Sequence, residues 1–203
     1  MSARHTDDEY FAALKTAAAK GDLDASWVLA EAYADGFVER ENGRWFFVRK
    51  NRTRAERLYR IVAETRERDV ILGLASVQKD LRDALRLERR AWRMGIVTAA
   101  NNMAMTYSMM GRPKACFRWL MRGYAVDPET CAYHLALCYL VGYGTARNPQ
   151  KASRLMNRVI RNEWECPGCL ECAAQFVEMM ERGEFPRAPR LGRSIGSVRP
   201  KPR

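Results

Sequence analysis

Residues 131–152 read CAYHLALCYLVGYGTARNPQKA and carry the clearest pattern in the chain. Small and apolar residues recur there at helical spacing up to Tyr139, which predicts one buried helix face. Gly142 and Gly144 end this helix, because glycine readily takes the left-handed conformation of a helix C-terminus. A second helix then opens at Lys151-Ala152. The stretch therefore predicts a helix, a short turn and a second helix.

The same block recurs twice upstream, which predicts an internal repeat. Its two further copies are Ala25-x-x-x-Leu29-Ala30-x-x-Tyr33-x-x-Gly36 and Ala99-x-x-x-Met103-Ala104-x-x-Tyr107, the latter with its glycine displaced to Gly111. A degenerate copy contains Leu72-Gly73. A single helix pair cannot bury its apolar face alone, so successive pairs are expected to stack into an array.

The last copy resembles the Sel1-like repeat family, a branch of the tetratricopeptide-like superfamily. The resemblance rests on Gly142, Gly144, Asn148, Lys151 and Ala152, and extends more weakly over about residues 10–180. It implies an all-α superhelix, a solenoid of about four to five helix-turn-helix repeats. It also implies a non-enzymatic adaptor, regulator or immunity-type protein that binds another protein.

Breaks at glycine and proline divide the chain into expected helices. They are 7–20, 24–35, 52–66, 69–78, 81–94, 98–110, 113–126, 129–141, 149–162 and 168–182. We expect residues 1–186 to form the repeat solenoid. Residues 187–203 are rich in Pro, Arg, Gly and Ser and predict a disordered basic tail.

The first copy departs from the family pattern after Gly36. Asn42-Gly43 separates two runs of β-prone residues, a strong short-range signal for a two-residue hairpin turn. The sequence therefore predicts a small β-hairpin near residues 37–49, inserted between two helices.

In arrays of this kind the first helix of each pair lines the concave surface, so the outward residues of these helices are candidate partner contacts. An apolar groove of Met and aromatic side chains suits a bound peptide or helix. The hairpin adds aromatic and Arg anchors. The candidates are Trp27, Glu31, Trp45, Phe47, Arg49, Asn101, Met105, Met109, Tyr133 and Leu137. Alternatively, another part of the chain covers the groove.

The net charge of +11 raises nucleic-acid binding as a second hypothesis. Residues 187–203 supply six of these charges and contain no acid, so the remaining chain is only mildly basic. Segment 39–60 carries eight basic and three acidic residues among its aromatics. Phosphate contact and base stacking by this segment and the tail would suit a single strand. Trp45 and Phe47 could instead cover the edge of the array.

Three cysteines, Cys166, Cys169 and Cys172, lie at the spacing of metal-binding thiols. A fourth ligand is missing nearby, so His134 or Cys138 would have to come from the adjacent repeat. Packing in a helix face and a redox disulfide are the other interpretations. We favour packing, and expect no metal and no cofactor.

Catalysis has little support, since the chain has two histidines and lacks a phosphate-binding glycine loop. The N-terminus has no apolar core of a signal peptide. Uncharged stretches 94–111 and 130–146 are too short or too polar to span a membrane. We therefore expect a cytoplasmic protein that is not an enzyme and makes no membrane contact.

Overall fold

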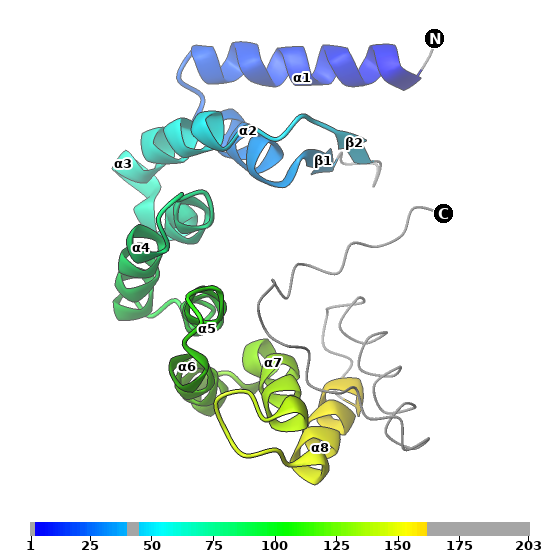
Figure 1. The fold of residues 1–203 in the computed structure, drawn as a ribbon. Coiled ribbons are helices and arrows are strands. Elements are labelled where there is room, and N and C mark those ends of the chain that lie inside the picture. Colours follow the sequence, from blue (N-terminus) through cyan, green and yellow to red (C-terminus); the bar gives the residue numbers. More distant parts are fainter. Residues whose placement is uncertain (1–2, 40–44, 162–203) are drawn as a thin grey trace. The chain divides into compact units, whose positions relative to one another are not determined.

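The computed structural model describes residues 3–39 and 45–161 (Figure 1). In these residues eight helices accompany two short strands. The elements are α1 (Ala3–Ala19), α2 (Leu23–Asp35), β1 (Phe37–Glu39), β2 (Trp45–Phe47), α3 (Arg52–Ser76), α4 (Leu81–Arg93), α5 (Ala99–Met109), α6 (Pro113–Val126), α7 (Pro128–Val141) and α8 (Pro149–Arg161). The helix expected at 168–182 and the tail expected at 187–203 lie outside the described residues.

The two largest differences from the expected helix boundaries are in α1 and α3. Helix α1 begins at Ala3, four residues earlier than predicted. The helices expected at 52–66 and 69–78 form one run, α3, with a kink at Arg66, where φ is −125° and ψ is 43°. No glycine or proline lies between Arg52 and Leu72, so nothing forces a loop there.

Residues up to Gly95 form one compact unit, called unit 1. In it α1 contacts α2, α2 contacts α3, and α3 contacts α4. The ring of Phe11 on α1 meets Tyr33 of α2 edge-on, with centroids 5.8 Å apart. The core cluster of this unit consists of Ala30, Tyr33, Ala55, Tyr59, Val62, Val70 and Val77.

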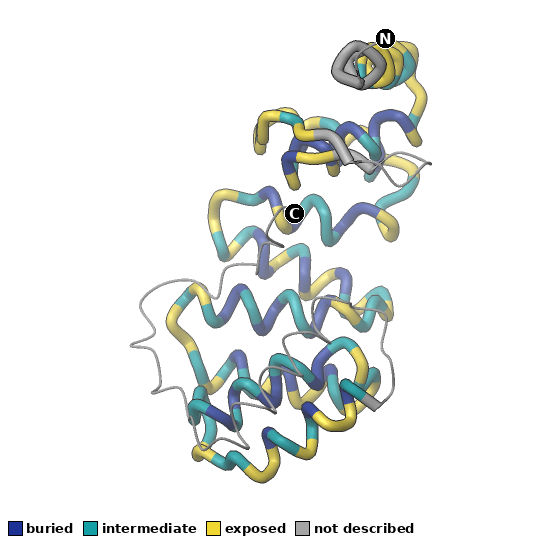
Figure 2. The backbone as a smooth tube through the Cα atoms, turned by 90° about the vertical axis from the view of Figure 1, so that its right-hand side faces the viewer, coloured by how far each residue is buried: buried dark blue, intermediate teal, exposed yellow. Residues whose placement is uncertain are grey.

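Residues from Ile96 onward belong to a second compact unit, unit 2, described here for residues 96–161. Here α5 pairs with α6, α6 with α7, and α7 with α8. A Cβ added to Gly123 of α6 would lie 2.4 Å from Cys131 Sγ and 2.9 Å from Ala100 Cβ. Glycine therefore lets α6 approach α5 and α7 closely. Figure 2 shows buried and exposed residues alternating along these helices.

One backbone hydrogen bond repeats in every clear copy of the sequence block. The carbonyl of the block's tyrosine accepts from the N–H of the residue that precedes the second helix, at 2.7–2.9 Å. The pairs are Tyr33 with Asn51, Tyr107 with Arg112, and Tyr139 with Asn148. This shared junction confirms that the three copies are structurally equivalent repeats.

Between Tyr33 and Asn51 the chain makes an excursion that contains β1 and β2. The two strands pair antiparallel, with Phe37 opposite Phe47 and Glu39 opposite Trp45. Below them the N–H of Val48 donates to the carbonyl of Gly36 at 2.9 Å. Each strand has three residues, so the pairing is shorter than the predicted span of 37–49. The expected turn at Asn42-Gly43 lies outside the described residues.

Within the described part of the chain, no helix is both long and apolar enough to cross a membrane.

Candidate functional site

In unit 1, α2 carries the first two candidate contact residues. Trp27 Nε1 donates a hydrogen bond to Glu31 Oε1 at 2.8 Å, one helical turn away. Trp27 is partly buried against the core cluster of unit 1, whereas Glu31 is exposed. The bond holds the indole N–H of Trp27 beside the carboxylate of Glu31. The surface of α2 is therefore apolar at Trp27 and acidic at Glu31.

The strand pair displays aromatic surface. Phe47 is 88% exposed, and Phe37, directly opposite it in the register, is 39% exposed. Arg49 follows β2 and is also exposed. Trp45 belongs to β2 and pairs with Glu39. A phenylalanine as exposed as Phe47 leaves most of its apolar area in water, which is typical of an interaction surface.

In unit 2, three of the candidate contact residues lie on α5, each about one helical turn from the next. Met109, at the end of the helix, is 61% exposed, while Met105 is partly buried. Asn101 is also partly buried, and its Oδ1 atom is buried without a hydrogen-bond partner. A buried acceptor without a hydrogen bond reduces the stability of the folded protein, so a hydrogen-bond donor at Asn101 Oδ1 would be favourable.

The α7 candidates are less accessible. Tyr133 and Leu137 are partly buried and pack against the core cluster of unit 2, which contains Ala132, Ala136 and Met156. The ring of His134 meets Tyr133 edge-on with centroids 5.4 Å apart, and its Nδ1 atom is buried without a hydrogen-bond partner. Burial lowers the pKa of His134.

The helices divide sharply by charge. The first helices of the clear repeats, α2, α5 and α7, contain no lysine or arginine. The second helices carry many, at least three in each of α3, α4, α6 and α8. This division is readable helix by helix in the sequence, but the overall charge count hides it. The first helices are therefore apolar or acidic, whereas the second helices are basic.

Some cations of segment 39–60 already have partners in unit 1. Arg54 donates to the Tyr33 hydroxyl at 3.2 Å and lies over that ring, 5.5 Å from its centroid. Arg60 pairs with Glu56 at 2.7 Å. These contacts reduce the charge that the segment offers to a phosphate backbone.

The described cysteines are structural. Cys116, Cys131 and Cys138 are free and buried. Burial, with a contribution from Asp127, raises the pKa of Cys131 to about 12. A hydrogen bond with Cys116 and burial raise the pKa of Cys138 far above the ordinary thiol value. Protonated thiols are poor metal ligands and nucleophiles.

Cys166, Cys169 and Cys172 lie outside the described residues. In the described part of the chain, no group of three or more His, Cys, Asp or Glu side chains is arranged to hold a metal ion.

The arrangement of stacked helix pairs defines the chain as an α-helical repeat protein. Its fold is that of Sel1-like repeat proteins, as the sequence resemblance implied. One similar solved structure is a Sel1 repeat protein from Oxalobacter formigenes, at TM-score 0.58 and 19% identity, covering 91% of this chain and 70% of that one. No family model matches the chain, and no curated protein matches it in sequence.

A second similar structure is a protective antigen of uropathogenic Escherichia coli strains that displays an SLR fold. It has a TM-score of 0.53 and 16% identity, over 95% of this chain and 45% of that protein. The chain thus spans about half the length of this antigen. At these identities the comparisons establish the all-α repeat fold.

Proposed function

We propose that this protein is a non-enzymatic interaction module that binds a partner protein through the faces of its first helices. In unit 1 the face comprises Trp27 and Glu31 of α2, with the neighbouring segment that carries Trp45, Phe47 and Arg49. In unit 2 it comprises residues of α5 and α7. These are Asn101, Met105, Met109, Tyr133 and Leu137. An adaptor, regulator or immunity-type role in the cytoplasm fits this activity.

The observation that carries the proposal is the absence of lysine and arginine from α2, α5 and α7. The core of a protein interface is depleted in charged residues and enriched in methionine and aromatic residues. The first-helix faces have this composition, and they leave Met109 61% exposed. A helix or extended peptide with apolar anchors is the partner element that such faces favour.

Affinity capture with structure-guided variants tests the proposal. The tagged full chain would be used to isolate proteins from its native lysate, after nuclease treatment and at about 0.5 M salt to suppress charge-driven contacts. Met109→Arg and Phe47→Ser should each reduce recovery of a stoichiometric partner. Val126→Ser is the matched control, since Val126 is also 61% exposed but lies at the end of α6.

Recovery of the partner with Val126→Ser and its loss with Met109→Arg would support the first-helix face. Equal recovery with all variants would contradict it. Loss of every partner under nuclease and salt would contradict the protein-interaction proposal itself.

A further inference from the structure

In residues 96–161 the positive charge is confined to the second helices and the adjoining turns. Residues 96–161 contain nine lysines and arginines and only two acids, a net charge of +7. None of the nine lies on α5 or α7. The nine residues are Arg112, Lys114, Arg118, Arg122, Arg147, Lys151, Arg154, Arg158 and Arg161. Residues 96–161 are thus more basic than the mild charge of the chain without its tail suggests.

The two acids of residues 96–161 cannot neutralise these cations. They are Asp127 and Glu129, at the corner between α6 and α7. Asp127 serves as the N-cap of α7: its Oδ1 atom accepts from the N–H of Glu129 at 3.1 Å, and its Oδ2 atom accepts from the Thr130 hydroxyl. At least seven of the nine cations are therefore not balanced by any acid in residues 96–161.

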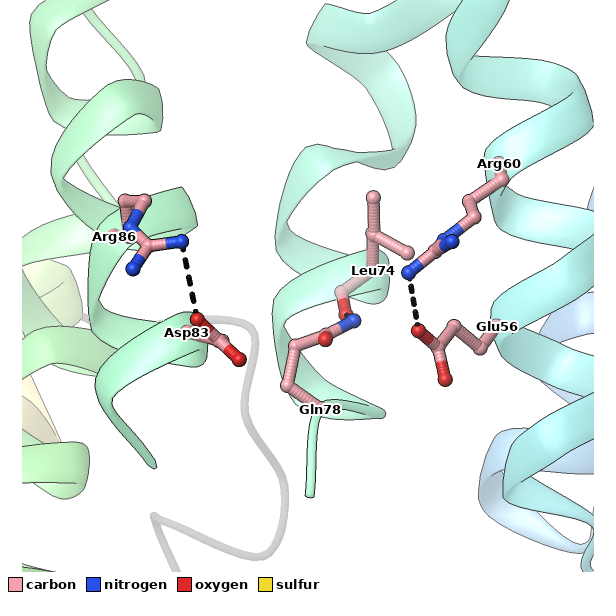
Figure 3. A network of polar contacts seen from close by, with 6 residues as sticks. All are labelled: Glu56, Arg60, Leu74, Gln78, Asp83 and Arg86. Carbon is pink, nitrogen blue, oxygen red and sulfur yellow. Dashed lines mark hydrogen bonds and ion pairs between the residues drawn. The ribbon is translucent and has the colours of Figure 1, made fainter. Parts of the chain in front are cut away.

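Unit 1 provides the contrast. Arginines of its second helices pair with nearby carboxylates, as Figure 3 shows for Arg60 with Glu56 and Arg86 with Asp83. Arg90 of α4 also reaches Glu67 of α3 at 2.6 Å. The second helices of unit 1 thus neutralise part of their own charge, while those of unit 2 have almost no acids with which to do so.

The cations of unit 2 form two regular rows. Lys114, Arg118 and Arg122 follow one another at i, i+4 and i+8 on α6, which is a step of about 6 Å along one helix face. All three side chains are exposed. The α8 row has the spacing i, i+3 and i+7 and is exposed as well; its members are Lys151, Arg154 and Arg158.

Direct contacts connect the α8 row with aromatic residues of α6 and α7. Arg158 of α8 donates a hydrogen bond to the Tyr124 hydroxyl of α6 at 3.1 Å. Lys151 Nζ lies 5.3 Å from the ring centroid of Tyr139 on α7. The edge of the same ring contacts Phe117 of α6, with centroids 5.3 Å apart. These contacts place aromatic rings of α6 and α7 beside Lys151 and Arg158 of the α8 row.

The α6 row also lines a depression. Arg112, Pro113, Lys114, Ala115 and Arg118 surround an open space of about 370 Å³ at the start of α6. Three of its five lining residues are cationic. The surface of this space is almost entirely apolar, so it adds no polar contact for a phosphate, and only the charged rows provide such contacts.

We propose that this basic face of α6 and α8 binds the phosphodiester backbone of a nucleic acid. Regularly spaced cations that outnumber the acids of residues 96–161 gain affinity by releasing the counterions of a polyanion. The aromatic rings among the cations suit contact with bases. This binding is separate from partner binding by the first helices. It uses the basic second helices α6 and α8, whereas α5 and α7 contain no lysine or arginine.

An anionic membrane fits this face less well. Insertion of a basic helix into an anionic membrane requires an exposed apolar stripe. The apolar residues Leu155 and Ile160 of α8 are instead packed against the core cluster of unit 2. An acidic protein would need carboxylates at regular intervals to match the cations of both α6 and α8. A nucleic acid carries one negative charge at every nucleotide and therefore fits these rows better.

Fluorescence anisotropy of labelled 20-mers with the full chain tests the proposal. Three nucleic acids of one mixed sequence are compared: single-stranded RNA, single-stranded DNA and duplex DNA. The comparison identifies which kind of nucleic acid the basic face binds. The triple variant Lys114→Gln, Arg118→Gln, Arg122→Gln should weaken binding at least tenfold. It should also reduce the slope of log affinity against log salt by about 2–3, since each phosphate contact contributes about 0.7–0.9.

The matched control removes the same number of exposed arginines from α4 of unit 1. The variant Arg82→Gln, Arg86→Gln, Arg93→Gln should leave the affinity within about twofold. Circular dichroism and the unfolding midpoint verify that both triple variants are folded. Absence of binding to all three nucleic acids would overturn the proposal. So would an equal loss in the two triple variants, or binding that depends only on residues 187–203.

Vesicles containing about 30% phosphatidylserine serve as the competing polyanion surface. Binding to vesicles that is lost in the α6 variant, without binding to any nucleic acid, would assign the face to a membrane and overturn the proposal.

Discussion

The carbonyl of Tyr33 accepts a hydrogen bond from the N–H of Asn51 at 2.9 Å, across the whole excursion that contains β1 and β2. The equivalent bond in the last repeat, from Asn148 to Tyr139, closes a much shorter connection. The excursion therefore leaves the repeat junction unchanged. This bond and the bond from the Val48 N–H to the Gly36 carbonyl close the base of the excursion.

Removal of residues 37–47, with Gly36 and Val48 joined by a short Asn-Gly linker, should leave the protein folded. The Tyr33–Asn51 junction and the packing of α2 on α3 do not require the strands. The unfolding midpoint in urea should remain close to that of the intact chain, while partner recovery falls because Phe47 is removed. Loss of the cooperative unfolding transition would show that the strands are part of the core.

Gly123→Ala should destabilise the protein by about 1–3 kcal/mol, the usual cost of overfilling a packed core. The new Cβ would lie 2.4 Å from Cys131 Sγ and 2.9 Å from Ala100 Cβ. Urea unfolding measures the loss. Adding Cys131→Ala should recover part of it, because the nearest clashing atom is removed. A Gly123→Ala protein as stable as wild type would contradict the close approach of α6 to α7.

Asn148→Ala should reduce the unfolding free energy by about 1 kcal/mol. Asn148 Oδ1 caps α8 by accepting from the N–H of Lys151 at 2.9 Å. Asn157 offers a control on the same helix, since it is exposed and lies in the helix interior. Thermal unfolding should show that Asn157→Ala has no such cost. Equal effects of the two substitutions would argue against the cap.

Stability should fall as the pH drops below about 6.5, the pKa of an unfolded histidine. Burial lowers the pKa of His134 in the folded protein, so between the two values the unfolded chain binds a proton that the folded chain does not. His134→Gln should flatten the stability curve between about pH 7.5 and 5.5. His5→Gln, which alters the other histidine, should not. An unchanged slope of stability against pH in the His134→Gln variant would contradict the lowered pKa of His134 in the folded protein.

Much of the repeat architecture is predictable from local patterns. Tyr33, Tyr107 and Tyr139 mark equivalent positions in sequence, and all three accept the same hydrogen bond in the structure. The break expected between residues 66 and 69 coincides with the kink at Arg66. The sequence did not predict that the chain stays helical through it as one bent helix. Partial burial of Trp27 and Tyr133 depends on tertiary packing, which helical periodicity alone does not specify.

The basic face of α6 and α8 was missed for a different reason. The whole-chain charge balance averages residues 96–161, at +7, with residues 162–186, which carry six acids and one arginine. A count for each helix would have found the rows of Lys114 and Arg118. Their relation to Tyr124 and Tyr139 required the structure, because it depends on how three helices pack.

Hydroxyl-radical footprinting of the full chain, alone and bound to its captured partner, tests the central claim most directly. Methionine oxidises readily, so Met109 on α5 and Met121 on α6, which are 61% and 41% exposed, report on the two classes of helix. Binding through the first helices predicts that Met109 is protected several-fold while Met121 stays as reactive as in the free protein. Protection of Met121 with an unchanged Met109 would contradict the account.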